Sequence, residues 1–265
     1  TDRNRTSPFA FTGNKFEFRM VGSKDSISAC NVVLNTITAE AFKEACDVLE
    51  SAEDFDLAVH DLIKEYATEH QRIVFNGNGY APEWEKEARR RGLPVLPSMV
   101  DAIPALTTAK AVELFGEFGV FTKTELESRA EIQYEIYAKA INIEAKTMVD
   151  MATKQIIPAV IKYTTVLAES INQVKAVGPI DVSVQMDLLK KASKLLKEVN
   201  STMNKLNKLV DQIETHPEGR DRAVFCREKL VPAMEKLREP VDELEMLVDK
   251  DMWPMPSYGD LVFEP

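Results

Sequence analysis

Apolar and polar residues follow two different periods along this chain. Between residues 15 and 21 they alternate one by one, which is the pattern of a β-strand with a single buried face. The phenylalanine and methionine side chains of this stretch are predicted to face a core. Lys15, Glu17 and Arg19 are predicted to share the opposite face, about 6 to 7 Å apart. The sequence therefore places a cation, a carboxylate and a second cation in one row.

After residue 26 the apolar positions recur with helical spacing instead. Helices are predicted over about 26–51 and 54–70, and Asp54 suits the N-cap position of the second. The two Asn-Gly pairs in 75–80 predict a tight turn. A short helix is predicted to follow, with Pro82 at its first position and Gly92 just past its end.

Three long helices are predicted in the second half of the chain. The first runs from Thr122 to about Ala176 with a bend at Pro158, and the second begins near Asp181 after a Gly-Pro break. The second helix has an apolar seam with steps of three and four, made of Leu189, Ala192, Leu196, Val199, Met203, Leu206, Val210 and Ile213. A third helix follows the 216–219 turn with Leu230, Met234, Leu237, Val241, Leu244 and Val248, and with kinks at Pro232 and Pro240. Long helices joined by short turns pack antiparallel, so we expect an extended bundle.

Two stretches lack this long helical pattern. Residues 93–121 are interrupted by prolines and glycines and are expected to form short helices and loops. Residues 253–260 contain two prolines and a glycine beside Trp253 and Tyr258. We expect this tail to be non-helical and to pack back onto the body of the protein.

The overall charge restricts the kinds of partner. With 33 basic and 43 acidic residues the net charge is −10, and 45% of the residues are hydrophobic. Nucleic acid and anionic membranes both reward clustered Lys and Arg, so neither is expected as a partner. Three widely spaced cysteines predict reduced thiols of the cytoplasm rather than a disulfide framework or a zinc site. The polar start without an initiator methionine leads us to expect a piece of a longer chain.

The N-terminal charges form the strongest candidate site. Arg3 and Arg5 lie upstream of the predicted strand in a loop that contains Ser, Thr and Gly. Planar guanidinium groups bind phosphate and carboxylate oxygens in pairs. Charge alternation on a strand is equally typical of a solvated sheet face. From the spacing alone both interpretations stay open.

Other polar groups are expected to have structural roles. The 76–79 turn lacks the Lys-Ser/Thr of a phosphate-binding loop. The three histidines, His60, His70 and His216, are expected at the surface or in capping positions. The 89–91 arginine cluster follows three glutamates on a short helix and is expected to form a solvated face at the helix C-terminus.

Residues 3–19, Arg-Asn-Arg-Thr-Ser-Pro-Phe-Ala-Phe-Thr-Gly-Asn-Lys-Phe-Glu-Phe-Arg, resemble the signature of type III glutamine synthetases. They are similar to the Asn-Arg-Ser … Arg-(Ile)-Glu-x-Arg segment of the shorter type I enzymes. The likeness continues through 75–80, 121–129, 141–148 and 253–261, so it covers nearly the whole chain.

The resemblance implies a two-step ligation. ATP phosphorylates the γ-carboxylate of glutamate, and ammonia then displaces phosphate to give glutamine, with Mg²⁺ or Mn²⁺ neutralising the phosphates. Matched residue by residue, Glu17 is implied to bind the metal and Arg19 to hold the glutamate substrate. Arg5 and Lys15 are implied to bind the nucleotide phosphates and stabilise the transferring group. Arg3 extends the nucleotide-binding set.

Two features depart from the type I pattern. Phe9-Ala10 stands where type I has a further arginine, and Lys15 stands where it has arginine, which removes bidentate phosphate binding there. Both fit type III. The family's other metal-binding strands, nucleotide pocket and ammonia-side residues precede this segment, so the chain alone is expected to be inactive.

The expected fold class is α+β, with a short β segment of a glutamine-synthetase-like catalytic domain followed by a mainly helical region with a long antiparallel bundle. Residues 1–50 are expected to form the edge of the catalytic domain, 51–121 a helical segment with turns, and 122–265 the bundle and tail. Because family members assemble as stacked rings, the implied partners are glutamate, ammonia, ATP and further copies of the chain, as stacked hexamers.

Two other functions stay open. The chain could be a non-catalytic helical scaffold in which the strand is only structural. It could also belong to a related ATP-dependent ligase that joins the γ-carboxylate of glutamate to an amine other than ammonia.

Overall fold

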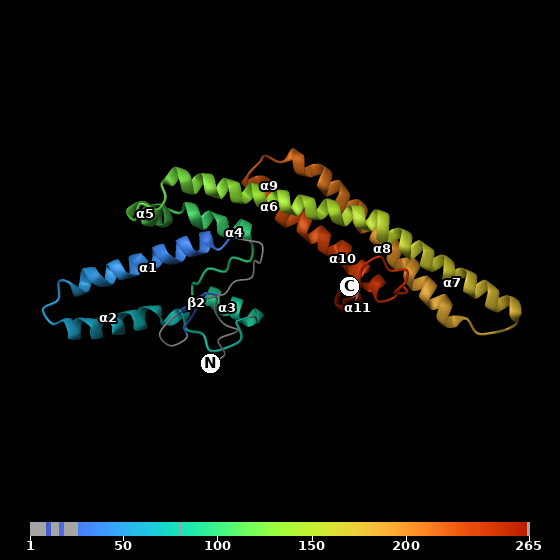
Figure 1. The fold of residues 1–265 in the computed structure, drawn as a ribbon, viewed down its shortest axis with the longest axis horizontal. Helices are drawn as coiled ribbons and strands as arrows, with labels where there is room; N and C mark the ends of the chain where they lie inside the picture. Colours follow the sequence, from blue (N-terminus) through green and yellow to red (C-terminus); the bar gives the residue numbers. More distant parts are fainter. Residues whose placement is uncertain (1–8, 12–15, 19–25, 80, 264–265) are drawn as a thin grey trace. The chain divides into compact units, whose positions relative to one another are not determined.

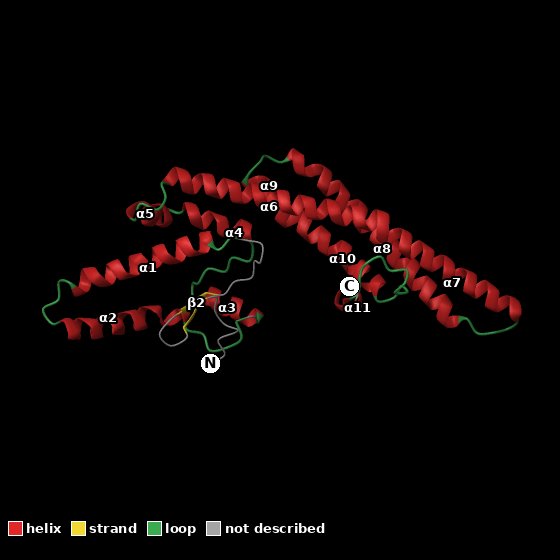
Figure 2. Cartoon of the chain, viewed as in Figure 1, coloured by secondary structure: helices red, strands yellow, loops and turns green. Residues whose placement is uncertain are grey.

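The computed structural model describes residues 9–11, 16–18, 26–79 and 81–263, and helices make up almost all of their regular structure (Figure 1, Figure 2). The chain divides into two compact units, residues 1–127 and 128–265. The division falls inside the long helix α6 (Lys123–Met151). The domain limits expected at residues 50 and 121 stay predictions.

Two short strands lie near the N-terminus of the first unit. Strands β1 (Phe9–Phe11) and β2 (Phe16–Phe18) pair antiparallel, with Phe9 opposite Phe18, Ala10 opposite Glu17 and Phe11 opposite Phe16. The expected α+β class is nevertheless wrong. Within the described ranges the β structure stops at these three residue pairs, which are too few to build a sheet with a core of its own. The apolar residues that do form cores have the helical period, so the fold is helical.

The first unit is built from short helices. They are α1 (Ser28–Leu49), α2 (Phe55–Glu69), α3 (Pro82–Arg90), α4 (Met99–Ala102) and α5 (Ala109–Glu117), with single 3₁₀ turns η1 (His70–Ile73) and η2 (Ile103–Thr107). Asp54 caps α2 by accepting a hydrogen bond from the Leu57 amide at 3.0 Å. Gly92, just past α3, adopts φ 71°, a conformation that glycine takes without strain. These local signals confirm the helix limits that the sequence predicts.

The turn before α3 is held by an arginine that the sequence analysis placed on a solvated face. The side chain of Arg91 is only 21% exposed, and its guanidinium lies 5.8 Å from the Phe75 ring centre and 5.9 Å from that of Trp84. The two rings contact each other at 4.3 Å between centroids. The expectation is therefore wrong for Arg91, because cation–π and backbone contacts with the turn replace water. Arg89 and Arg90 are exposed, as expected.

The second unit contains the long helices. After α6 come a π-helical turn η3 (Ala152–Ile156), α7 (Ile157–Val177), α8 (Ser183–Gln212), the 3₁₀ turn η4 (Ile213–Thr215), α9 (Arg220–Phe225), a second π turn η5 (Cys226–Leu230), α10 (Val231–Glu245) and α11 (Tyr258–Phe263). Helix α8 packs against both α7 and α10, and Figure 1 shows α7 and α8 as an antiparallel hairpin. The predicted bundle is present.

Both π turns end two residues before a proline. Pro158 lies in the first turn of α7, after η3, and Pro232 lies in the first turn of α10, after η5. Proline lacks the amide hydrogen of the helical ladder, and its ring collides with the carbonyl four residues earlier. A widened π turn relieves that collision without ending the helix. The expected bends at these two prolines therefore take the form of π turns.

The seam of α8 differs from the prediction at two leucines, because Leu189 is only half-buried and Leu195 takes the place of Leu196. Its buried positions are Ala192, Leu195, Val199, Met203, Leu206, Val210 and Ile213, so Leu195 is buried (4% exposed) and Leu196 is only half-buried. On the third helix Leu230, Leu237, Leu244 and Val248 are buried as predicted. Met234 is only half-buried, and Pro240 is buried in place of Val241.

The C-terminal tail is partly helical, which corrects the prediction for residues 253–260. Tyr258 begins α11, and Ser257 caps it by accepting from the Asp260 amide at 3.3 Å. The Asp260 carboxylate in turn accepts from the Ser257 amide at 2.6 Å. This reciprocal cap overrides the glycine at position 259. The tail does pack back, because Trp253 and Met255 line a pocket of about 270 Å³ with α6 and α10.

Candidate functional site

Only one of the predicted site residues lies in the described part of the chain. Glu17 is in β2, where its backbone is opposite Ala10. Arg3, Arg5, Lys15 and Arg19 lie outside the described residues. The metal-binding, substrate-binding and phosphate-binding roles implied for these five residues therefore stay predictions.

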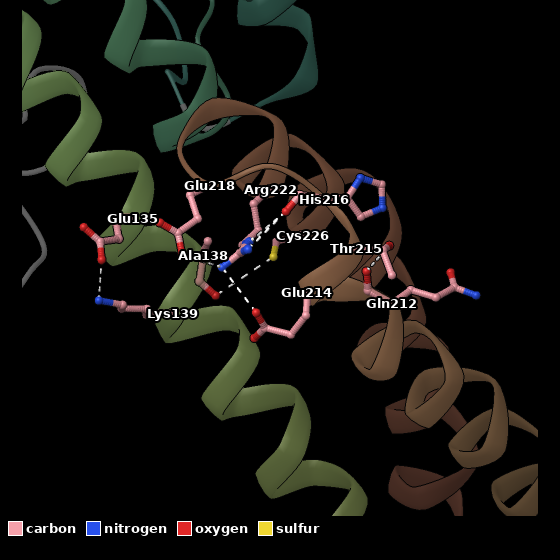
Figure 3. Close-up of polar contacts among 10 residues, drawn as sticks. All are labelled: Glu135, Ala138, Lys139, Gln212, Glu214, Thr215, His216, Glu218, Arg222 and Cys226. Carbon is pink, nitrogen blue, oxygen red and sulfur yellow. Dashed lines mark hydrogen bonds and ion pairs between the residues drawn. The ribbon is translucent and has the colours of Figure 1, made fainter.

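The polar site that the structure does describe lies in the second unit, between α6, η4 and α9. Its pocket of about 260 Å³ is lined by Glu135, Ala138, Lys139, Asn142, Ile213, Glu214, Glu218, Gly219 and Arg222. Figure 3 shows the polar contacts around Arg222. The sequence predicted the 216–219 turn beside this pocket but gave no signal for the pocket itself. Its residues come from segments about 80 positions apart, and only the packing of α6 against α9 brings them together.

Arg222 is the centre of this polar cluster, and its side chain is only 19% exposed. Its Nε and Nη2 atoms donate to the carbonyl oxygen of His216 at 3.3 and 3.1 Å. Its Nη1 atom lies 3.6 Å from Glu214 and 3.5 Å from Glu218. One guanidinium therefore ties the end of η4 to the first turn of α9.

Gly219 and His216 fix the turn next to Arg222. Gly219 has φ 80°, and a β-carbon there would collide with the Glu131 carboxylate of α6. The imidazole of His216 stacks on the Phe225 ring at 4.0 Å between centroids. The positive φ is what requires glycine at position 219, because the end of the flexible Glu131 side chain can move away from a β-carbon.

The α6 side of the pocket carries an ion pair and an unpartnered amide oxygen. Lys139 pairs with Glu135, and the hydrogen bond from Lys139 lowers the pKa of the Glu135 carboxyl below its usual range. The Oδ1 atom of Asn142 is buried and has no hydrogen-bond partner. A polar molecule in the pocket could donate to this oxygen.

Cys226 lies beneath the cluster as a buried thiol. Its Sγ atom is 3.9 Å from the carbonyl oxygen of Ala138, and the residue is 0% exposed. Burial raises the pKa of the thiol to about 11, although the nearby Arg222 acts in the opposite direction. The thiol therefore stays protonated at neutral pH and does not act as a nucleophile.

The ion pairs around Arg222 and the buried thiol of Cys226 are suited to holding the helices together rather than to catalysis. Each charged group of the cluster has an opposite charge as its neighbour, and the thiol is inert. Within residues 26–79 and 81–263 no group of three or more His, Cys, Asp or Glu side chains is arranged to hold a metal ion. The described residues therefore do not supply a complete ligand set for the divalent metal that the resemblance implies, and we derive no reaction step from them.

A second acidic pocket lies in the first unit. It measures about 410 Å³ and is lined by Ile37, Glu40, Ala41, Glu44, Lys110, Glu113, Leu114 and Glu117 of α1 and α5. Lys43 bridges α1 and α5 through Glu117 at 3.4 Å, and the hydrogen bond that Lys43 donates to the Asp47 carboxylate raises the pKa of the Lys43 ammonium. The excess of carboxylates attracts cationic groups to this face.

Comparison with known proteins finds a similarity in the helical part of the chain. Residues 58–175 match the family described as the glutamine synthetase C-terminal domain. The match runs from α2 to near the end of α7 and includes the α6 side of the polar pocket.

The particular relatives agree with the N-terminal motif. Over 99% of its length the chain is 36% identical to the type-3 glutamine synthetase of Dictyostelium discoideum. It is 34% identical to the glutamine synthetases of Bacteroides fragilis and Butyrivibrio fibrisolvens over the same share of the chain. The resemblance to type III glutamine synthetases is confirmed. The chain spans only 37 to 38% of the length of these relatives. Among the described residues no helix is long and apolar enough to cross a membrane.

Proposed function

We propose that this chain is part of a type III glutamine synthetase, which uses ATP to ligate ammonia to glutamate through a γ-glutamyl phosphate. The observation that carries the proposal is the similarity to enzymes of that name along 99% of the chain, the N-terminal motif included. The domain match over 58–175 supports the same assignment. By itself the chain is proposed to be inactive.

The proposed site roles belong to the N-terminal segment. Glu17 binds the divalent metal, Mg²⁺ or Mn²⁺, and Arg19 holds the substrate glutamate. Arg5 and Lys15 bind the ATP phosphates and stabilise the phosphoryl group during transfer, with Arg3 as a further phosphate contact. A metal beside fixed cations supplies charge neutralisation for phosphoryl transfer. Lys15 offers a point charge where type I enzymes have a planar fork.

The helical units are proposed to serve assembly. Unit 2 buries the apolar seams of α8 and α10 internally, so it forms a stiff body rather than a catalytic cavity. The proposed partners are further copies of the protein in a ring-shaped homo-oligomer, located in the cytoplasm.

Substitution of Glu17 in the longer protein tests the site. Glu17→Ala is expected to abolish glutamine formation, because removing a metal-ligating carboxylate removes the ion that neutralises the phosphates. Oligomer size, measured by analytical ultracentrifugation, is expected to stay unchanged. Glu169→Ala, at an exposed carboxylate on α7, is the matched control and is expected to retain full activity. Near-normal turnover of Glu17→Ala would remove the site assignment.

The amine specificity needs a separate measurement. Phosphate release with ammonia is compared with release in the presence of a panel of primary amines. Faster release with an amine than with ammonia would assign the protein to the related γ-glutamyl-amine ligases. If glutamate does not increase phosphate release with ammonia or with any amine, the protein is not a ligase of this kind, and the non-catalytic scaffold is the remaining function.

A further inference from the structure

Helix α6 has two apolar faces within the second unit. Its buried face is made of Ala130, Tyr134, Ala138 and Ala145, each at most 5% exposed. A second apolar set consists of Ile132, Ile136 and Ile143, which are 49%, 53% and 65% exposed. At 100° per residue the mean directions of the two sets differ by about 180°. No change of rotamer can turn the three isoleucines toward the core.

The spacing of the isoleucines is that of a helix–helix contact. Single exposed apolar residues are common on protein surfaces and need no explanation. Three β-branched side chains on one face, spaced by four and seven residues, instead follow the seam pattern by which two helices pack. Arg129 lies at one end of this face and Asp150 at the other, and both are exposed.

We infer that α6 packs antiparallel against α6 of a second copy of this chain, about a two-fold axis between Lys139 and Ala140. That axis places Ile136 of one copy opposite Ile143 of the other. It also places Ile132 opposite Thr147, a small residue that leaves room for the isoleucine. Because the axis is two-fold, each contact occurs twice, as in other isologous interfaces.

Charge complementarity selects this arrangement over the parallel one. In the antiparallel register Arg129 of each copy faces Asp150 of the other. Asp150 also pairs with Lys154 along its own chain, so the end of the contact forms an ion-pair network. A parallel pair would place Arg129 against Arg129 and Asp150 against Asp150, and like charges at close range oppose binding. The stretch from Arg129 to Asp150 is about 32 Å long and ends just before the π turn η3.

Cysteine cross-linking tests the register directly. Cys30→Ser and Cys46→Ser remove the more accessible thiols and leave the buried Cys226. In this background, chains that carry Ile136→Cys are mixed with tagged chains that carry Ile143→Cys and are oxidised mildly. We expect disulfides mainly between the unlike chains, because position 136 faces position 143 of the other copy and neither position faces its own equivalent. Cross-links formed mainly between like chains would overturn the antiparallel register.

Sedimentation equilibrium of the 265-residue chain tests the contact itself. Ile136→Asp is expected to raise the dimer dissociation constant at least tenfold, because the interface would bury an unpaired carboxylate. Ile161→Asp, on α7 and 50% exposed, is the matched control and is expected to leave the constant unchanged. Circular dichroism confirms that each variant is folded. A chain that stays monomeric up to about 100 µM and forms no 136–143 cross-link would contradict the inference. These readouts do not involve catalysis, so they are independent of the proposed function.

Discussion

The guanidinium of Arg91 donates a hydrogen bond to the carbonyl oxygen of Val74, with 2.7 Å between Nη1 and O, across seventeen positions of sequence. The same nitrogen donates to the carbonyl oxygen of Arg72 at 3.1 Å, and Nε contacts the Glu87 carboxylate at 2.5 Å. One side chain therefore joins the end of α3 to the segment that precedes the Asn-Gly turn. This contact fixes how α3 follows α2 in the first unit.

Removing Arg91 should destabilise the first unit. Arg91→Ala leaves two backbone carbonyls without their charged donor and takes a cation from the Phe75 and Trp84 rings, so we expect a loss of about 1–3 kcal/mol in the free energy of unfolding. Urea unfolding measures it through Trp84 fluorescence in a Trp253→Phe background, because Trp84 then reports on the first unit alone. Arg89→Ala, whose side chain is 57% exposed, is the control and should cost less than about 0.5 kcal/mol. Equal losses of unfolding free energy in the two variants would show that the Arg91 contacts do not stabilise the first unit.

Arg222 should have the corresponding role in the second unit. Arg222→Ala leaves the His216 carbonyl oxygen without its donor and Glu214 and Glu218 without a shared cation. We expect a loss of about 2 kcal/mol in the free energy of unfolding. Trp253 fluorescence in a Trp84→Phe background follows this unit. Arg238→Ala removes an arginine that is 74% exposed and should have little effect. A stability of Arg222→Ala within error of Arg238→Ala would contradict the role given to the cluster.

The position of α11 should depend on pH in a narrow acidic range. The hydrogen bond from Lys250, at 2.8 Å, and those from Ser257 lower the pKa of the Asp260 carboxyl to about 2, from its ordinary value of 3.8. Because the pKa of Asp260 is lower in the folded protein than in the unfolded chain, ionised Asp260 stabilises the fold at pH values above about 4. This stabilisation is lost as the pH falls from about 4 through about 2. The carboxyl carbon shift of Asp260, followed by NMR, should titrate near pH 2. Asp260→Ala, which removes the acceptor, should abolish the protection of the Ser257 amide from hydrogen exchange at every pH. An ordinary midpoint near 3.8 would show that the tail contact does not form.

The three cysteines should differ widely in reactivity. Cys46 is exposed and Cys30 is half-buried, whereas Cys226 is 0% exposed and its pKa is raised to about 11 by burial. At pH 8 the thiolate of Cys226 is scarce and inaccessible, so a thiol reagent should label Cys46 first and leave Cys226 unmodified until the protein unfolds. Mass spectrometry of digested protein after timed labelling identifies the modified sites. Labelling of Cys226 at the rate of Cys46 in folded protein would contradict the packing of α9 against α6.

Sequence alone determined where several of the helices begin and end. Asp54 as a cap, Pro82 in a first turn and Gly92 beyond a last turn act over only three or four residues, so their effect is independent of the rest of the fold. The heptad spacing of the third helix likewise identified Leu230, Leu237 and Leu244 as buried. The N-terminal motif indicated the resemblance to type III glutamine synthetases, but the roles of its charged residues stay predictions because their side chains lie outside the described residues.

Tertiary structure decided what depends on a partner segment. Leu195 and Leu196 are adjacent and equally apolar, and only the packing of α8 between α7 and α10 buries the first. Arg91 is mostly buried because the segment before the Asn-Gly turn offers it the carbonyl oxygens of Arg72 and Val74. Arg222 is mostly buried because the chain after η4 offers it the carbonyl oxygen of His216. The expected α+β class failed for the same reason: the alternating pattern predicts a strand, and β2 does pair with β1, but three residue pairs do not build a core. Local periodicity fixes an element, whereas contact between distant segments fixes which of its faces is buried.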